Sequence, residues 1–335
     1  MIKSALTFSF LIACASGLHA QSFTKYAGEF MAGGTGARYL GMGNSAVSLT
    51  NDAYAVYWNP AGLIHVNNTQ LAVMHAERFS GLVSLDFVSV AVPWQERYSI
   101  GLGVLRSGVD DLPDTRDGWD FNLNRPKTGF VPSYFNAADY VFYGSFAAQD
   151  LMFWPVGFTA KYIYRSYGSV AGAWGIGLDA GTQKKGVFFD NLTVGIVLRD
   201  ITSTLIVWES GTSELIPPSA ETGVSAEFDL PVGSLLVAAG VINRLENRRS
   251  TAQFNWGALS HDFKAGAEWQ YRQTLALRAG YNELERVNLG AGFRLQTLWI
   301  DYAFEHFSGD LDLGNSHRIS VTFDLNRLGP TRNVE

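Results

Sequence analysis

Apolar and polar residues alternate along most of this chain, from residue 69 onward. In the stretch 261–272, for example, Phe263 and Ala265 alternate with Lys264 and Gly266. Successive side chains of a β-strand point to opposite faces, so a period of two gives one apolar face and one polar or small face. The pattern therefore predicts a series of amphipathic β-strands.

Fourteen such strands are expected. Their predicted bounds are 69–76, 82–92, 97–107, 138–149, 155–166, 172–183, 191–199, 219–228, 233–244, 261–272, 274–282, 286–296, 298–307 and 317–325. The connections alternate in length: every second one is a short turn, such as 93–96, whereas several of the others are long, such as 108–137, 200–218 and 245–260. An even strand number, short periplasmic turns and longer outer loops are typical of outer-membrane barrels.

Two soluble architectures, a β-sandwich and a propeller, also contain short amphipathic strands. The aromatic residues favour the membrane barrel, because many lie at or near predicted strand ends. These are Trp94, Tyr98, Trp154, Tyr164, Trp208, Trp269, Tyr271, Tyr281 and Trp299. Aromatic girdles belong at the two membrane interfaces. We therefore expect an all-β transmembrane barrel of fourteen antiparallel strands, with outer-membrane lipid as its partner.

Residues 1–20 predict an export signal. Lys3 is followed by an apolar run and by small residues up to Ala20, which is the pattern of a secretory signal peptide. A lipoprotein cleavage box ending at Cys14 is the competing interpretation. Cys14 is the only cysteine, so cleavage after Ala20 would leave no disulfide or thiol chemistry. The protein is expected in the outer membrane of a Gram-negative cell envelope.

Charge and motifs exclude several classes of function. The formal net charge of −6 argues against a nucleic-acid partner, because no basic face exists to displace phosphate counterions. The six histidines are scattered without metal-ligand spacing, and no nucleophile elbow is present. We expect no catalytic residue, no metal and no cofactor, and therefore a protein that is not an enzyme. The aspartates within 108–137 are interpreted as part of a solvated outer loop.

Residues 21–66 lack the strand pattern and are rich in glycine and other small residues. We expect them to form a plug, or hatch, inside the barrel. The predicted organisation is a signal peptide over 1–20, the hatch over 21–66, the barrel over 67–325 and a polar tail over 326–335. Many inward positions of the predicted strands are glycine or alanine, which leaves room for a hatch.

Three motifs stand out in the hatch. They are Ala37-Arg38-Tyr39-Leu40-Gly41-Met42-Gly43, Asn51-Asp52-Ala53 and Tyr57-Trp58-Asn59-Pro60-Ala61-Gly62-Leu63. Together they resemble the N-terminal signature of the PorV/PorQ family, a group within the FadL-like outer-membrane transport superfamily. The resemblance implies a fourteen-stranded barrel closed by a hatch. Its motif residues are Arg38, Gly41, Gly43, Asp52, Trp58, Asn59, Pro60, Ala61 and Gly62.

The resemblance also implies partners and a function. The leading interpretation is a barrel of the PorV/PorQ type that handles exported cargo, with secreted proteins or type IX secretion subunits as partners, or a hydrophobic ligand. The alternative is a FadL-like channel, through side openings, for long-chain fatty acids or other hydrophobic small molecules. A structural or surface-attachment protein is the third interpretation.

Two hatch motifs have a structural interpretation beside a functional one. The Asn59-Pro60-Ala61-Gly62 string predicts a tight turn, because proline fixes φ and asparagine caps its own backbone; such a turn is either rigid or part of a moving gate. Gly41 to Ala46 match the spacing of a dinucleotide-binding fingerprint, but no strand precedes them. We interpret these glycines as sites of close packing.

Charged residues of both signs occupy predicted inward positions. They are Lys161, Arg165, Arg199, Glu227, Lys264, Glu268, Arg272, Arg278, Arg294, Asp301, Glu305, Arg318 and Asp324. Ion pairs between neighbouring strands would fill the interior and hold the hatch. The functional alternative is a site for the carboxylate of a fatty acid or of a cargo C-terminus. Its candidate residues are Lys264, Arg278, Arg294, Asp301, Glu305 and Arg318.

Overall fold

The computed structural model describes residues 28–151, 153–245, 251–257, 259–306, 314–325 and 330–332. The expected signal peptide, Cys14 and the first seven residues of the expected hatch lie outside these ranges. The same holds for 326–329 and 333–335 of the expected tail. None of the helices within the described ranges is long and apolar enough to cross a bilayer.

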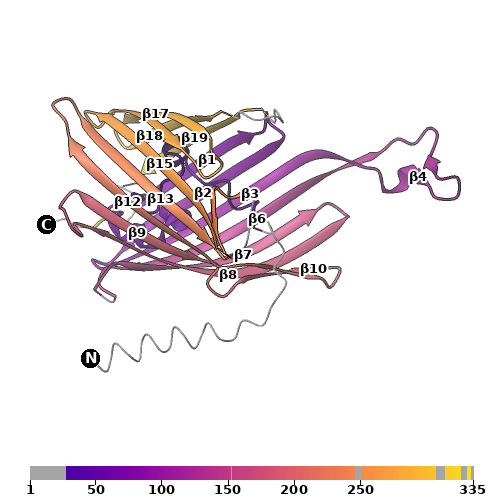
Figure 1. The fold of residues 1–335 in the computed structure, drawn as a ribbon, viewed down its shortest axis with the longest axis horizontal. Helices are drawn as coiled ribbons and strands as arrows, with labels where there is room; N and C mark the ends of the chain where they lie inside the picture. Colours follow the sequence, from indigo (N-terminus) through magenta and orange to yellow (C-terminus); the bar gives the residue numbers. More distant parts are fainter. Residues whose placement is uncertain are drawn as a thin grey trace, which may run out of the picture.

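Fourteen antiparallel strands close into a barrel (Figure 1). They are β1 (Gln70–Arg78), β2 (Val83–Trp94), β3 (Tyr98–Asp114), β6 (Ser133–Ala148), β7 (Val156–Tyr167), β8 (Ala171–Lys185), β9 (Leu192–Arg199), β12 (Ser219–Asp229), β13 (Ser234–Arg244), β15 (Leu259–Tyr271), β16 (Leu275–Tyr281), β17 (Val287–Leu295), β18 (Leu298–Glu305) and β19 (Ser316–Asp324). Each pairs with its sequence neighbour, and β1 pairs with β19 to complete the ring. The fold class and the fourteen strands predicted from alternation are confirmed.

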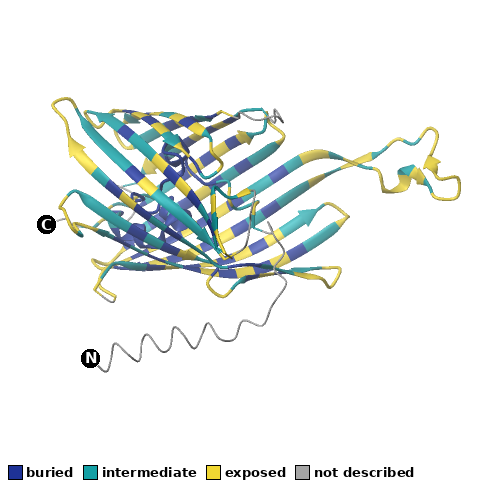
Figure 2. Cartoon of the chain, viewed as in Figure 1, coloured by how far each residue is buried: buried dark blue, intermediate teal, exposed yellow. Residues whose placement is uncertain are grey.

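The strands turn apolar side chains outward and polar or small side chains inward. On β15, Phe263 is 52% exposed whereas Lys264 is 3% exposed, and on β17 Leu289 is 53% exposed whereas Asn288 is fully buried. Figure 2 shows the result as alternating bands of exposed and buried residues along the strands. A continuous exposed apolar band of this kind needs an apolar cover, which a bilayer supplies.

The connection 108–137, expected as a loop, is an arm built mainly from strand. Strand β3 continues to Asp114 and pairs there with Ser133, the first residue of β6. The tip of the arm carries a short helix and a small hairpin: η2 (Arg116–Gly118), β4 (Trp119–Asp120) and β5 (Arg125–Pro126). The arm projects from one end of the barrel (Figure 1). A loop is the expectation because aspartates lower strand propensity. That expectation was wrong because pairing with β6 overrides this preference.

Two other long connections also contain strands. Residues 200–218 contain β10 (Thr204–Trp208) and β11 (Ser213–Ile216), and residues 245–260 contain β14 (Phe254–Trp256). Strand β10 pairs with the first half of β8, whereas β9 pairs with the second half. The wall therefore changes strand partners at the arm end of β8.

Residues 28–66 lie inside the ring of strands, where Figure 1 shows them in indigo. They form α2 (Ala37–Gly41), α3 (Ala55–Trp58) and the 3-10 helix η1 (Pro60–His65). Their aromatic side chains pack against the wall: the rings of Tyr54 and Phe87 stack with centroids 5.7 Å apart, and Tyr57 meets Tyr143 edge-on. The apolar core of the molecule is thus the interface between the hatch and the barrel.

Candidate functional site: the hatch and its two cavities

The hatch backbone rests directly on glycines of the barrel wall. A Cβ at Gly195 of β9 would lie 2.2 Å from the Val47 carbonyl oxygen, and a Cβ at Gly280 of β16 would lie 2.1 Å from the Gly43 nitrogen. Real Cβ atoms do not approach backbone so closely. Other wall glycines in the same relation to hatch atoms are Gly157, Gly181 and Gly266. The hatch therefore sits on a track of glycines that no larger residue could replace without movement.

Glycines of the hatch motif contribute to the same close approach. Gly43 has a φ of 62°, which favours glycine, and a Cβ there would lie 2.5 Å from the Tyr281 carbonyl oxygen. Gly41 faces Gly290 of β17, whose Cα would lie 3.1 Å from an added Cβ. Gly41 ends α2 rather than following a strand of a βαβ unit. These contacts fit the packing interpretation of the glycines.

Asn59 connects three parts of the structure and is fully buried. Its Nδ2 donates to the carbonyl oxygens of Val47 in the hatch, at 2.8 Å, and Thr182 in β8, at 3.1 Å. Its Oδ1 accepts from the Ala61 N–H at 3.1 Å, at the start of η1. One side chain thus satisfies a hatch loop, its own turn and the wall.

Arg199, at the end of β9, holds the end of α3. Its guanidinium donates to the carbonyl oxygens of Tyr57, at 2.9 Å, and Trp58, at 3.1 Å, and lies 3.5 Å from the Glu221 carboxylate. The Trp58 indole N–H donates to the Thr35 carbonyl oxygen at 2.9 Å, within the hatch. The sequence placed Arg199 inside the barrel but gave no sign of this contact.

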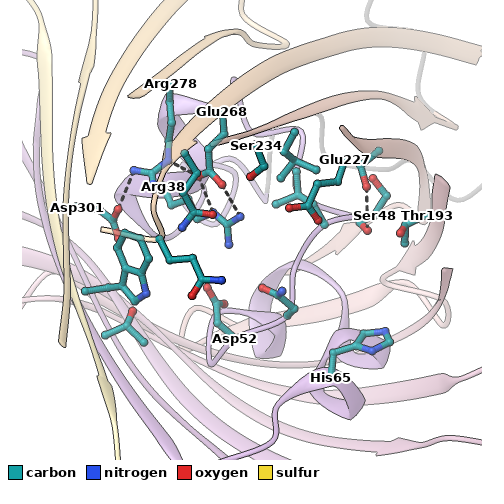
Figure 3. Close-up of a pocket in the computed structure, with 18 of the residues that line it drawn as sticks. Arg38, Ser48, Asp52, His65, Thr193, Glu227, Ser234, Glu268, Arg278 and Asp301 are labelled. Atoms are coloured by element: carbon teal, nitrogen blue, oxygen red, sulfur yellow. Dashed lines mark hydrogen bonds and ion pairs between the residues drawn. The ribbon is translucent and has the colours of Figure 1, made fainter. Parts of the chain in front are cut away.

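A network of ion pairs connects the hatch to strands β15, β16 and β18 of the wall (Figure 3). Arg38 of α2 makes two hydrogen bonds to the carboxylate of Glu268 on β15, at 2.8 and 2.9 Å. Arg278 on β16 donates to Glu268 at 2.5 Å and to Asp301 on β18 at 2.7 Å. Two arginines and two carboxylates alternate, so every charge in this network has an opposite neighbour.

Asp52 of the hatch lies beside this network and is an internal acceptor. It accepts from the Tyr39 hydroxyl at 2.7 Å and from the Tyr54 N–H at 2.9 Å. Burial raises the pKa of the Asp52 carboxyl above its ordinary value. The geometry makes Asp52 a fixed part of the hatch.

Of the six residues predicted as a lumen charge cluster, Arg278, Arg294 and Asp301 border one cavity and Lys264 borders another. Arg278 binds Asp301, Lys264 binds Glu221, Glu305 binds Arg286, Arg318 donates to the Gly33 carbonyl oxygen, and Arg294 donates to the Gln296 carbonyl oxygen. Lys264 and Arg278 could take a ligand carboxylate only by giving up a carboxylate of their own. Arg318 and Arg294 bind carbonyl oxygens instead.

The remaining charged residues that were predicted to face the interior make several kinds of contact. Their contacts are those of Lys161 with Asp179 and Asp200, of Arg165 with Asp139, of Asp324 with Asn68, and of Arg272, which lies in a tight turn, with the ring of Tyr271. Glu227 is exposed and borders a cavity. Lys161 and Arg165 thus make ion pairs, whereas the contacts of Asp324 and Arg272 are of other kinds.

Removing Arg278 should destabilise the barrel far more than removing Arg294. Arg278→Met leaves Glu268 and Asp301 buried with less compensation, at a cost of about 3–5 kcal/mol. Arg294 makes one bond near the mouth, so Arg294→Met should cost about 1 kcal/mol or less. Denaturant unfolding in detergent measures both. Equal losses would show that the network contributes no more than a surface contact.

The hatch lies between two cavities. The inner cavity, at the short-turn end, has a volume of about 590 Å³ and is lined mainly by polar residues, including Ser48, Asp52 and Glu268 (Figure 3). The outer cavity, at the arm end, has a volume of about 120 Å³ and touches Met31 and Trp58 of the hatch. Both are bordered by residues of the hatch and of the wall.

The outer cavity adjoins an apolar patch on the wall. Ile216 of β11 packs with Ala173 and Ile206, and Phe30 and Met31 of the hatch cover them. Ile216 also lines the cavity, as do the two prolines, 217 and 218, that link β11 to β12. Proline has no backbone N–H, so this link cannot donate to a neighbouring strand. Along the described ranges, β11 pairs with β10 alone.

No metal-binding arrangement was found in the described ranges: no group of three or more histidine, cysteine, aspartate or glutamate side chains could hold an ion.

Comparison with protein-family models and with curated proteins finds no match. Solved structures do match. The Pseudomonas putida toluene transporter TodX aligns with a TM-score of 0.59 at 14% identity, covering 88% of this chain and 98% of that chain. The Ralstonia pickettii toluene transporter TbuX gives 0.55 at 15% identity, covering 86% and 96%. A Pseudomonas aeruginosa FadL homologue gives 0.54 at 14%, covering 87% and 98%.

At such low identities the likeness concerns the fold. It extends over nearly the full length of each of these proteins, so barrel and hatch are compared together. The PorV/PorQ resemblance of the hatch motifs gains no support from these matches. This chain therefore has the β-barrel fold of FadL-like transporters.

Proposed function

We propose that the chain is an exported outer-membrane barrel through which a hydrophobic small molecule passes, and that the hatch is the barrier on its route. The observation that carries this proposal is the position of the hatch between two cavities, where ion pairs, hydrogen bonds and apolar packing against the wall hold it. The outward apolar band and the fold shared with toluene transporters support it. By the usual orientation, the short turns and the inner cavity face the periplasm.

The proposed route begins at the apolar patch beside the outer cavity. A hydrophobic molecule gains from contact with Ile216 and Met31, and charged side chains such as Lys161 line the rest of that cavity. The change of strand partners around β8, with the two prolines beside it, is the part of the wall best suited to a side opening. Movement of the hatch would then release the molecule into the inner cavity.

The hydrophobic route is favoured over the secretion-linked role and over pure surface attachment. The structural matches include transporters named for toluene, whereas the secretion interpretation rests on the hatch motifs alone.

Uptake of toluene and of a long-chain fatty acid, in cells lacking the gene and in complemented cells, tests the proposal. Complementation by the natural chain should restore uptake of at least one of them. Ile216→Glu, which puts a charge at the apolar patch, should not restore it. Val131→Glu makes the same kind of change at an 82% exposed position on the arm, and should behave like the natural chain.

Two results would contradict the proposal. One is full uptake with Ile216→Glu, provided that the barrel is folded. The other is unchanged uptake on deletion together with loss of proteins from the cell surface, which would favour the secretion-linked role.

A further inference from the structure

The last described residues, 330–332, pair with the segment that joins the hatch to β1. The Pro330 carbonyl oxygen accepts from the N–H and the hydroxyl of Thr69, at 3.2 and 3.1 Å. The Arg332 N–H donates to the Asn67 carbonyl oxygen at 2.7 Å. An isolated antiparallel bridge lies between these two bonds. We call residues 330–332 the strap.

The side chain of Arg332 connects the strap to the hatch and to the wall. Its Nη1 donates to the carbonyl oxygen of Ile64, in the last turn of η1. Its Nη2 donates to the Tyr98 carbonyl oxygen at 2.8 Å and to the Ser99 hydroxyl at 3.0 Å, both on β3. One guanidinium thus fastens the inner end of the hatch to the barrel.

His65, the last residue of η1, follows Ile64 in the chain and is poorly placed to carry a positive charge. Its Nε2 is buried and has no hydrogen-bond partner among the described residues. Burial lowers the pKa of the ring, and the positive charges of Arg332 of the strap and Lys185 of β8 lower it further. Asp324, at the end of β19, lines the same cavity as His65; one of its oxygens accepts from Asn68, and the other has no partner among the described residues. The closed strap therefore favours the neutral imidazole.

We propose that His65 is a proton-sensitive release for the strap. Protonation would add a third positive charge beside Arg332 and Lys185, on a ring whose Nε2 has no hydrogen-bond partner among the described residues, and so displace the Arg332 clamp. The open strap exposes His65 to water and binds the proton more readily, so a fall in pH through the ordinary histidine range favours opening. The hatch would then be held at its other contacts alone. The consequence for transport rests on the proposed function, whereas the strap itself does not.

Hydrogen exchange of the full chain in detergent tests the release. After correction for intrinsic rates, protection of the Thr69 and Arg332 amides should fall about tenfold or more between about pH 7.5 and about pH 5. His65→Gln cannot be charged and should keep its protection at the lower pH. Arg332→Gln should lack protection at both. His317→Gln changes an exposed histidine bonded to the Tyr302 hydroxyl and should follow the natural chain.

Loss of protection at low pH in His65→Gln, as large as in the natural chain, would overturn the inference. His65→Asn, which is also uncharged, gives the same test if His65→Gln fails to fold. Uptake measured on the same variants separates the two proposals. If the strap opened at low pH while uptake stayed the same, the proton-sensitive release would be supported. The same result would contradict the proposal that the hatch is the barrier to uptake.

Discussion

Gly280→Ala is expected to unseat the hatch and make the barrel leak bulky solutes. The added Cβ would lie 2.1 Å from the Gly43 nitrogen and 2.4 Å from the Met42 carbonyl carbon. Both are backbone atoms on the inside of a closed ring, so neither can turn away as a side chain could. Overpacking of this kind costs about 1–3 kcal/mol, which is comparable to several of the polar contacts that hold the hatch.

The leak is best measured as sensitivity of cells to antibiotics too large for an intact outer membrane. Gly144→Ala is the matched control, because Gly144 lies on β6 with no atom within 4 Å of an added Cβ. It makes the same change within a barrel strand and should leave sensitivity unaltered. A folded Gly280→Ala barrel as tight as the control would show that the glycine track does not set the position of the hatch.

The barrel wall was predictable because the face of each strand residue is a local property. Whether Phe263 or Lys264 faces outward follows from the period of two, without knowledge of the partner strands. The arm was missed for the opposite reason: its strands are stabilised by pairing between Asp114 and Ser133, residues whose own preferences favour a loop.

The hatch contacts could not be read from the sequence. Arg38 and Glu268 are 230 positions apart. They meet because closure of the ring places strands β15 to β18 beside α2. The sequence correctly favoured ion pairing of inward charges, yet it grouped Arg278 with Lys264, and these two residues border different cavities. Only the order of strands around the ring decides which charges share a neighbour.

The Asn59-Pro60 turn offers a second way to loosen the hatch, by removing attraction rather than adding a clash. Asn59→Ala with Pro60→Ala abolishes the bonds to Val47, Thr182 and Ala61. Each buried group left without a partner costs about 1–3 kcal/mol of stability. Loss of the proline costs a further ~0.4–1 kcal/mol, because the unfolded chain gains conformational entropy. The strand pairs of the barrel are untouched.

We therefore expect raised permeability to bulky antibiotics, with denaturant unfolding of the barrel wall close to that of the natural chain. Asn122→Ala with Pro126→Ala alters the same two residue types at exposed positions of the arm and should change neither property. If the Asn59 and Pro60 variant did not leak and its barrel was folded, the ion pairs of Arg38 and the hydrogen bonds of Arg199 would suffice to hold the hatch. If the barrel unfolded with it, the hatch would be part of the folding core rather than a separate, movable barrier.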